Sequence, residues 1–145
     1  MKSIWSMVMR FRAAIEDAQS VGEFDSDYFG RFPRGCCGDA SDMLAQYLVE
    51  HGVKTKYIVG TYWDDETGDS QSHAWLLLNE ETIIDITGDQ FQYNPVFLNF
   101  NKQVYIGPMD AFHRLFEVEP WGIRDLDRLD ARQKDLYRKI IKHIR

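Results

Sequence analysis

Apolar side chains recur at every third or fourth position in two stretches near the start of the chain. The first stretch, residues 3–21, predicts an amphipathic helix that buries its apolar stripe. A second helix is predicted from residue 38 or 39 to His51, with Gly52 as its C-terminal stop. Residues 22–35 separate the two helices, and their glycine, aspartate and aromatic residues predict a loop.

Further along the chain the apolar pattern changes to a period of two, which indicates β-strands. Residues 55–63, 73–79 and 82–87 are rich in β-branched and aromatic side chains and predict three strands. An acidic loop separates the first two of these strands, and a tight Asn-Glu-Glu turn separates the second pair. Residues 102–107 predict a fourth strand. We expect these strands to form an antiparallel sheet, because such short connections join antiparallel neighbours.

The last third of the chain gives weaker signals. Residues 109–119 are compatible with either a helix or a strand. Residues 126–144 predict a C-terminal helix with four inward residues: Leu136, Ile140, Ile141 and Ile144. The predicted order is helix, helix, antiparallel sheet, helix, which is typical of an α+β fold. A length of 145 residues suits a single domain over residues 1–145.

Composition narrows the classes of protein to which the chain can belong. A hydrophobic content of 44% and a charged content of 28% are ordinary for a globular protein. The formal net charge of -6 argues against nucleic acid or an anionic membrane as a partner. Residues 131–145 are basic, and we interpret them as a solvated helix face. Apolar runs are too short for a signal peptide or a membrane span, so we expect a cytoplasmic protein with free thiols.

Both cysteines of the chain, Cys36 and Cys37, stand side by side at the start of the second predicted helix. A helix start exposes unpaired N–H groups and a partial positive charge, which stabilise a thiolate and can hydrogen-bond an oxyanion. The position therefore suits a nucleophile, and a small buried side chain is the other interpretation. A strained vicinal disulfide and a zinc site without a second cysteine pair fit less well. We expect no metal and no cofactor.

His73 and Asp85 each interrupt an apolar strand, where a polar side chain has no packing reason to be. If the turn pairs Leu78 with Thr82, Asp85 is a diagonal neighbour of His73 on the same sheet face, about 7 Å away. A shift of the register by one residue would put the two side chains on opposite faces. The other histidines lie at predicted helix ends or in the ambiguous segment: His51, His143 and His113.

Three short blocks together resemble the transglutaminase-like branch of the papain-like cysteine enzymes. That branch has Gly-x-Cys at a helix start, His-Ala-Trp on one strand and Asp-x-Thr on the next. The corresponding blocks here are Gly35-Cys36-Cys37, His73-Ala74-Trp75 and Asp85-Ile86-Thr87. The resemblance covers residues 31–92, which is under half of the chain.

The resemblance implies that Cys37 is the nucleophile, His73 its base and Asp85 the residue that orients the base. It implies a papain-like fold in which the helix that starts at the nucleophile packs on the antiparallel sheet. The implied function is thiol-dependent acyl chemistry on an amide bond of a peptide or protein, as in a peptidase, amidase, deamidase or acyltransferase. A toxin that deamidates or cross-links host proteins would use the same chemistry. The alternative is a non-catalytic protein-interaction module on the same scaffold.

One residue departs from the papain pattern. Arg31 stands where that pattern has a glutamine as an oxyanion donor, so the second donor is not assigned.

Overall fold

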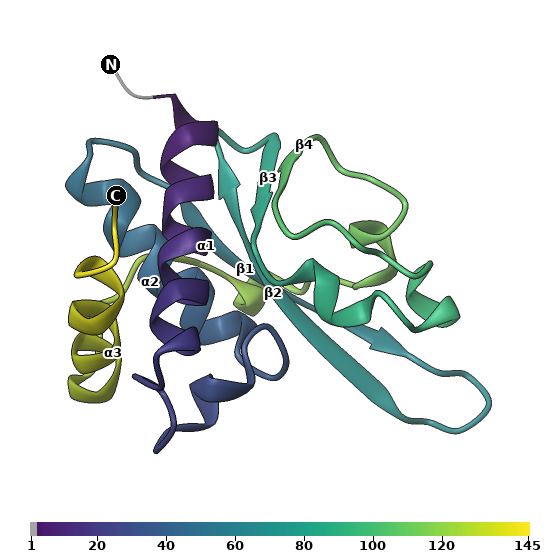
Figure 1. Cartoon of the computed structure of the whole chain (residues 1–145). Coiled ribbons are helices and arrows are strands. Elements are labelled where there is room, and N and C mark those ends of the chain that lie inside the picture. The colour runs from purple at the N-terminus through teal and green to yellow at the C-terminus, as the bar shows by residue number, and fades with distance from the viewer. Residues whose placement is uncertain (1–2) are drawn as a thin grey trace.

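The computed structural model describes residues 3–145 and places three α-helices beside an antiparallel sheet (Figure 1). Within these residues the helices are α1 (Ile4–Ser20), α2 (Cys37–Glu50) and α3 (Ala131–Ile141). Helices α1 and α2 confirm the two predicted N-terminal helices. The α+β class is confirmed as well.

In the described part of the chain the sheet has five strands, in the order β4-β3-β2-β1-β5, and neighbouring strands run antiparallel. Four of them confirm predicted strands: β1 (Lys56–Trp63), β2 (Ser70–Leu78), β3 (Thr82–Asp85) and β4 (Tyr105–Gly107). The fifth, β5 (Ile123–Asp125), was not predicted. Its three residues include two charged ones and carry no readable alternation, so only the pairing with β1 defines it as a strand.

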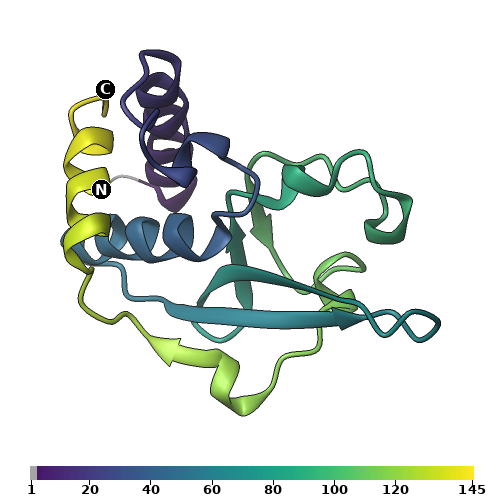
Figure 2. The same cartoon turned by 90° about the horizontal axis from the view of Figure 1, so that it is seen from below.

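The two faces of the sheet bury different sets of side chains. Leu76 and Ile84 join the core that α1, α2 and α3 form. Trp75 and Ile83, one position away on each strand, point to the opposite face and join aromatic residues of segment 91–116. Figures 1 and 2 show the same division, with the helices on one side of the sheet and the loops of the green segment on the other.

The C-terminal helix is shorter than the predicted helix over residues 126–144, because a cap starts it at Ala131. The Asp130 carboxylate accepts a hydrogen bond from the Gln133 backbone N–H at 2.7 Å, and the Gln133 side chain accepts one from the Asp130 N–H at 3.1 Å. This reciprocal capping box leaves residues 126–130 outside the helix. Of the four residues predicted to face inward, two are buried and two are half-buried: Leu136 and Ile140, then Ile141 and Ile144.

Segment 109–119 is neither the helix nor the strand that its pattern allowed. It contains one 3-10 turn at His113–Leu115 and a single bridge between Thr61 and Glu117. This irregular segment brings His113 into the buried layer on the sheet face that carries Trp75.

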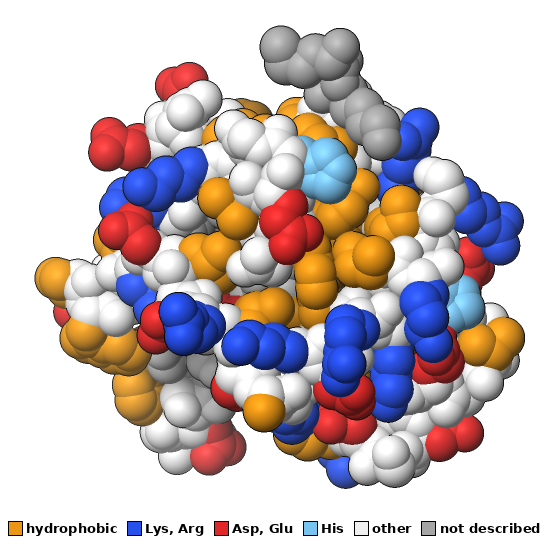
Figure 3. Space-filling view, turned by 90° about the vertical axis from the view of Figure 1, so that its left-hand side faces the viewer, with side chains coloured by type: hydrophobic (Ala, Val, Ile, Leu, Met, Phe, Trp, Pro, Cys, Tyr) orange, Lys and Arg blue, Asp and Glu red, His pale blue; other side chains and the backbone are white. Residues whose placement is uncertain are grey.

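The face of the molecule that carries α3 displays a band of lysine and arginine side chains (Figure 3). Several cations of α3 have acidic partners in the same chain. Arg132 lies 2.9 Å from Asp27 and 2.8 Å from Asp39, and Lys139 lies 3.1 Å from Asp135. Such pairing fits the interpretation of the basic segment as a solvated helix face. Across residues 3–145, every helix is too short or too polar to cross a membrane.

Candidate active site

Helix α2 starts at Cys37, so the cysteine pair lies at a helix N-terminus. Gly35 has a φ of +69°, a left-handed conformation that glycine adopts without strain, and there the chain turns toward the helix. The Cys36 side chain is 2% exposed, whereas Cys37 is half-buried. Burial raises the pKa of Cys36 to about 12, and the neighbouring Cys37 and Asp39 add to this effect. Cys36 therefore stays protonated at neutral pH, and Cys37 is the more accessible thiol.

Strands β2 and β3 bring His73 and Asp85 into contact. Their register pairs Leu78 with Thr82, as the sequence required for a shared face. Nε2 of His73 lies 2.7 Å from Oδ2 of Asp85, and the two side chains are 0% and 1% exposed. The diagonal contact expected from the register is therefore present.

The two nitrogens of the His73 ring have different surroundings. Nε2 is bonded to Asp85, so a neutral ring carries its proton on Nε2 and leaves Nδ1 unprotonated. Among the described residues, none hydrogen-bonds to this buried Nδ1. Burial lowers the pKa of His73, but the charge and hydrogen bond of Asp85, followed by the Cys37 thiol, outweigh burial and raise it to about 9. The Cys37 thiol therefore lies near enough to the His73 ring to raise its pKa.

The raised pKa of His73 predicts that stability falls in alkaline solution. Because the folded-state pKa of about 9 exceeds the ordinary 6.5, the stabilisation is complete below pH 6.5 and is lost as the pH rises through 9. We expect the free energy of unfolding in urea to fall by on the order of 2–3 kcal/mol over this interval. His73→Gln should remove the step, and His51→Gln, at an exposed histidine, should keep it. A wild-type free energy that stays constant or rises would contradict the assignment.

Asp85 is held at both carboxylate oxygens. Oδ1 accepts a hydrogen bond from the backbone N–H of Thr87 at 2.9 Å. Oδ2 lies 2.7 Å from Nε2 of His73 and 2.7 Å from Nε2 of His113. Burial by itself raises the pKa of Asp85, but the His73 charge and the hydrogen bonds from both histidines outweigh it and hold the pKa below its ordinary value. Asp85 is therefore a buried carboxylate that stays ionised.

His113 belongs to this site, and the sequence did not identify it. Its ring is fully buried, with Nε2 on Asp85 and Nδ1 2.7 Å from Oδ1 of Asp110. Asp110 also accepts a hydrogen bond from the His113 backbone N–H at 2.8 Å. The available signal was an aspartate three residues before a histidine within an apolar segment. That signal does not reveal contact with a strand 28 residues earlier in the chain.

Aromatic rings enclose the group of His73, Asp85 and His113, which we call the histidine–aspartate group. Four ring centroids lie 5.2–5.7 Å from the centroid of His73: Phe91, Phe116, Phe112 and Trp75. These rings exclude water, and the lower local dielectric strengthens the ionic hydrogen bonds inside the group. Trp75 is itself buried and packs in this layer.

The side chains of the histidine–aspartate group are also of metal-ligand type, and their ligand atoms all lie within 4.8 Å of one another. Each histidine nitrogen lies 2.7 Å from the shared carboxylate oxygen, which is the distance of a charge-assisted hydrogen bond. A tetrahedral zinc ion with bonds of about 2.0–2.1 Å would hold its ligand atoms about 3.3 Å apart. The geometry therefore favours protons between these atoms.

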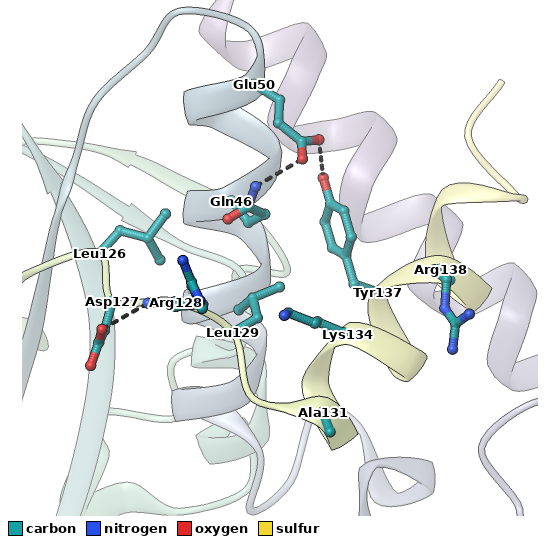
Figure 4. A pocket seen from close by; sticks show the side chains of 10 residues that line it. All are labelled: Gln46, Glu50, Leu126, Asp127, Arg128, Leu129, Ala131, Lys134, Tyr137 and Arg138. Carbon is teal, nitrogen blue, oxygen red and sulfur yellow. Dashed lines mark hydrogen bonds between the residues drawn. The ribbon is translucent and has the colours of Figure 1, made fainter.

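A pocket of about 890 Å³ lies elsewhere, between α2, α3 and the segment that leads into α3 (Figure 4). Lys134 and Leu129 help to line it, and the Tyr137 hydroxyl donates a hydrogen bond to Glu50 at 2.6 Å on its wall. Neither the two cysteines nor the histidine–aspartate group lines this pocket. It is therefore separate from the candidate site.

Comparison with known proteins leaves the family open. No protein-family model and no solved structure matches the chain. The chain is 28% identical over 97 residues to callose synthase 3 of Arabidopsis thaliana, a match that covers 66% of this chain and 5% of that protein. It is 33% identical over 90 residues to the uncharacterized protein YuaU of Escherichia coli strain K12, covering 60% of this chain and 41% of YuaU. The chain therefore spans less than half the length of either relative.

Proposed function

We propose that this protein transfers an acyl group from an amide bond to the thiol of Cys37 and then to water or an amine. In this proposal His73 is the general acid and base, and Asp85 orients its ring. The substrate is an amide of a peptide or protein. The activity is accordingly that of a peptidase, amidase, deamidase or acyltransferase.

One observation carries the proposal: Nε2 of His73 is bonded to Asp85, and among the described residues none pairs with its buried Nδ1 by geometry. The Cys37 thiol raises the pKa of the same ring. A cysteine nucleophile needs a base, and the base needs a third group that orients it. An unbonded polar atom in a protein interior costs about 1–3 kcal/mol, so a ring that only supports the fold would have this nitrogen paired. A nitrogen that exchanges a proton with a thiol and a substrate has a reason to be free.

The chemistry follows from these positions. The Cys37 thiolate attacks the carbonyl carbon, a C–S bond forms, and an electron pair moves onto the oxygen, where the N–H groups at the start of α2 can bind it. When the C–N bond breaks, the leaving amine takes the proton from Nδ1 of His73 and a thioester remains. Neutral His73 then accepts a proton from the attacking water or amine, and the thiolate leaves as the acyl group is transferred.

The arrangement of the elements supports the papain-like, transglutaminase-like form of the proposal. The helix that begins at Cys37 packs on β2, which carries His73, and Asp85 ends the adjacent strand β3. This order of the three residues along the elements supports the form of enzyme that the sequence resemblance implies.

Alkylation of the thiols by iodoacetamide tests the proposal without a known substrate. We expect Cys37 to react nearly as fast at pH 6 as at pH 8, because the protonated His73 ring stabilises the thiolate. An ordinary thiol with a pKa of about 8.5 reacts roughly a hundredfold more slowly at pH 6 than at pH 8. Mass spectrometry of the digested protein identifies which cysteine carries the label.

Two variants serve as controls for the alkylation. Cys36→Ala should keep the flat pH profile, whereas His73→Ala should restore the steep profile of an ordinary thiol. A wild-type profile that rises about tenfold per pH unit from pH 6 to 8 would contradict the enzyme and favour the non-catalytic interaction module.

A further inference from the structure

We infer that His113 and Asp110 form a positioning pair for Asp85, so that the site extends from Cys37 through His73 and Asp85 to two further residues. The inference rests on the proposed function, because it gives His113 a part in the same reaction. His113 acts through Asp85 and is a positioning residue.

His113 connects the partly exposed Asp110 with the buried Asp85 of the site. Asp110, whose side chain is 22% exposed, lies 2.7 Å from Nδ1 of His113 and accepts the His113 backbone N–H at 2.8 Å. On the other side of the ring, Nε2 lies 2.7 Å from Oδ2 of Asp85. The same oxygen lies 2.7 Å from Nε2 of His73. Two histidines therefore share one carboxylate oxygen inside a buried group.

These contacts limit where the protons can be. An ionised carboxylate only accepts hydrogen bonds, and both nitrogens of His113 face a carboxylate oxygen. Both contacts form together only if the ring carries two protons or if one aspartate is protonated. Hydrogen bonds from both rings to Oδ2 offset the cost of burying the charge of Asp85.

The shared oxygen restricts the rotation of Asp85. The Thr87 N–H holds Oδ1, and two rings hold Oδ2. Without His113, one ring alone would hold Oδ2, and the carboxylate could turn and change the direction in which Nδ1 of His73 points. Such changes matter because a misplacement of about 1 Å can cost a hundredfold in rate. A histidine with a purely structural role would affect stability and leave this direction unchanged.

The experiment compares His113→Leu with His113→Gln. Leucine removes both donors, whereas the glutamine amide nitrogen occupies the place of Nε2 and still donates to Asp85. The first measurement is the exchange rate with water of the His73 imidazole proton bound to Asp85, by NMR. The second is the rate of Cys37 alkylation by iodoacetamide at pH 6. We expect His113→Leu to speed the exchange and slow the alkylation, each by about tenfold or more, and His113→Gln to restore both to within about threefold.

Two further variants make the comparison specific. His143→Gln alters a histidine paired with Glu23 outside the site and should change neither measurement. If His113→Leu does not fold, Asp110→Asn tests the pair from its partly exposed end. It removes the charge facing Nδ1 of His113 and should move both measurements in the same directions, by a smaller factor.

Folded His113→Leu or Asp110→Asn protein that keeps both wild-type values would overturn the inference. So would uptake of one equivalent of Zn²⁺ by the wild type with loss of the imidazole proton signal, because the group would then be a metal site. The two proposals can fail separately. If Cys37 is unreactive in the wild type but the exchange rate of the His73 proton still changes in the His113 variants, the proposed function is refuted and the positioning contact is kept. If Cys37 is reactive and its alkylation rate is the same in the wild type and the His113 variants, the positioning pair is refuted and the proposed function is kept.

Discussion

Replacing Cys37 with alanine is expected to abolish formation of a covalent acyl-protein, whereas Cys36→Ala should leave it intact. The probe is p-nitrophenyl acetate, whose acetyl group passes to a reactive thiol as p-nitrophenolate leaves. The loss in rate should be on the order of a thousandfold or more, as for removal of a catalytic nucleophile. Cys36 cannot replace its neighbour, because it is 2% exposed and burial raises its pKa to about 12. The release of p-nitrophenolate gives the rate, and mass spectrometry locates the acetyl group.

Folding of the variants provides the control for this loss. Cys37 is half-buried, so we expect Cys37→Ala to change the free energy of unfolding by about 1 kcal/mol at most. An acetyl group found on Cys36 would reassign the nucleophile. Wild-type protein that releases p-nitrophenolate no faster than Cys37→Ala would count against any thiol acyl chemistry.

The part of the site that the sequence predicted depends on local signals. The apolar periods of α2, β2 and β3 determine which face of the helix and of each strand is buried. The Asn-Glu-Glu turn determines the register that joins His73 to Asp85. A buried polar residue inside an apolar strand then marked each partner. Both signals lie within short segments, so they can be read without the tertiary structure.

The parts that the sequence did not predict depend on long-range packing. His113 lies in a segment with no regular period, and only its contact with Asp85 gives it a place. Strand β5 exists because β1 offers it an edge. Arg12 lies on an ordinary amphipathic helix and pairs with Glu16 one turn later, yet its other partners are 74 to 91 residues away. No pattern within one segment distinguishes such a residue from an arginine on the surface.

Arg12 ties α1 to the segment that follows Asp85. Its Nη1 donates to the carbonyl of Ile86 at 2.7 Å and to Oδ1 of Asp89 at 2.9 Å, and its Nη2 donates to Oδ2 of Asp89 at 3.0 Å. The Arg12 and Asp89 side chains are 7% and 6% exposed. A further bond reaches the carbonyl of Gln103 at 3.2 Å. The buried, bidentate ion pair between Arg12 and Asp89 fixes the backbone of residues 86–89, just after Asp85.

Arg12→Met is expected to lower the free energy of unfolding by about 3–5 kcal/mol. The variant leaves Asp89 buried without its cation and leaves the Ile86 carbonyl without this donor. Urea unfolding at pH 7 measures the loss. Arg138→Met is the matched control, because Arg138 is exposed and pairs with Asp135 on the surface, and it should cost less than about 1 kcal/mol.

A double variant, Arg12→Met with Asp89→Leu, separates the ion pair from the other bonds of Arg12. Two uncharged side chains can occupy the site of a buried pair, so the double variant should recover part of the stability that either single change removes. Recovery stays incomplete, because the carbonyls of Ile86 and Gln103 still lose their donor. If the loss of unfolding free energy in the double variant equals the sum of the losses in the two single variants, the ion pair itself does not contribute to stability. Cys37 alkylation at pH 6 should be slower in the double variant than in the wild type, because residues 86–89 have lost their bonds to α1 and no longer hold Asp85 in place.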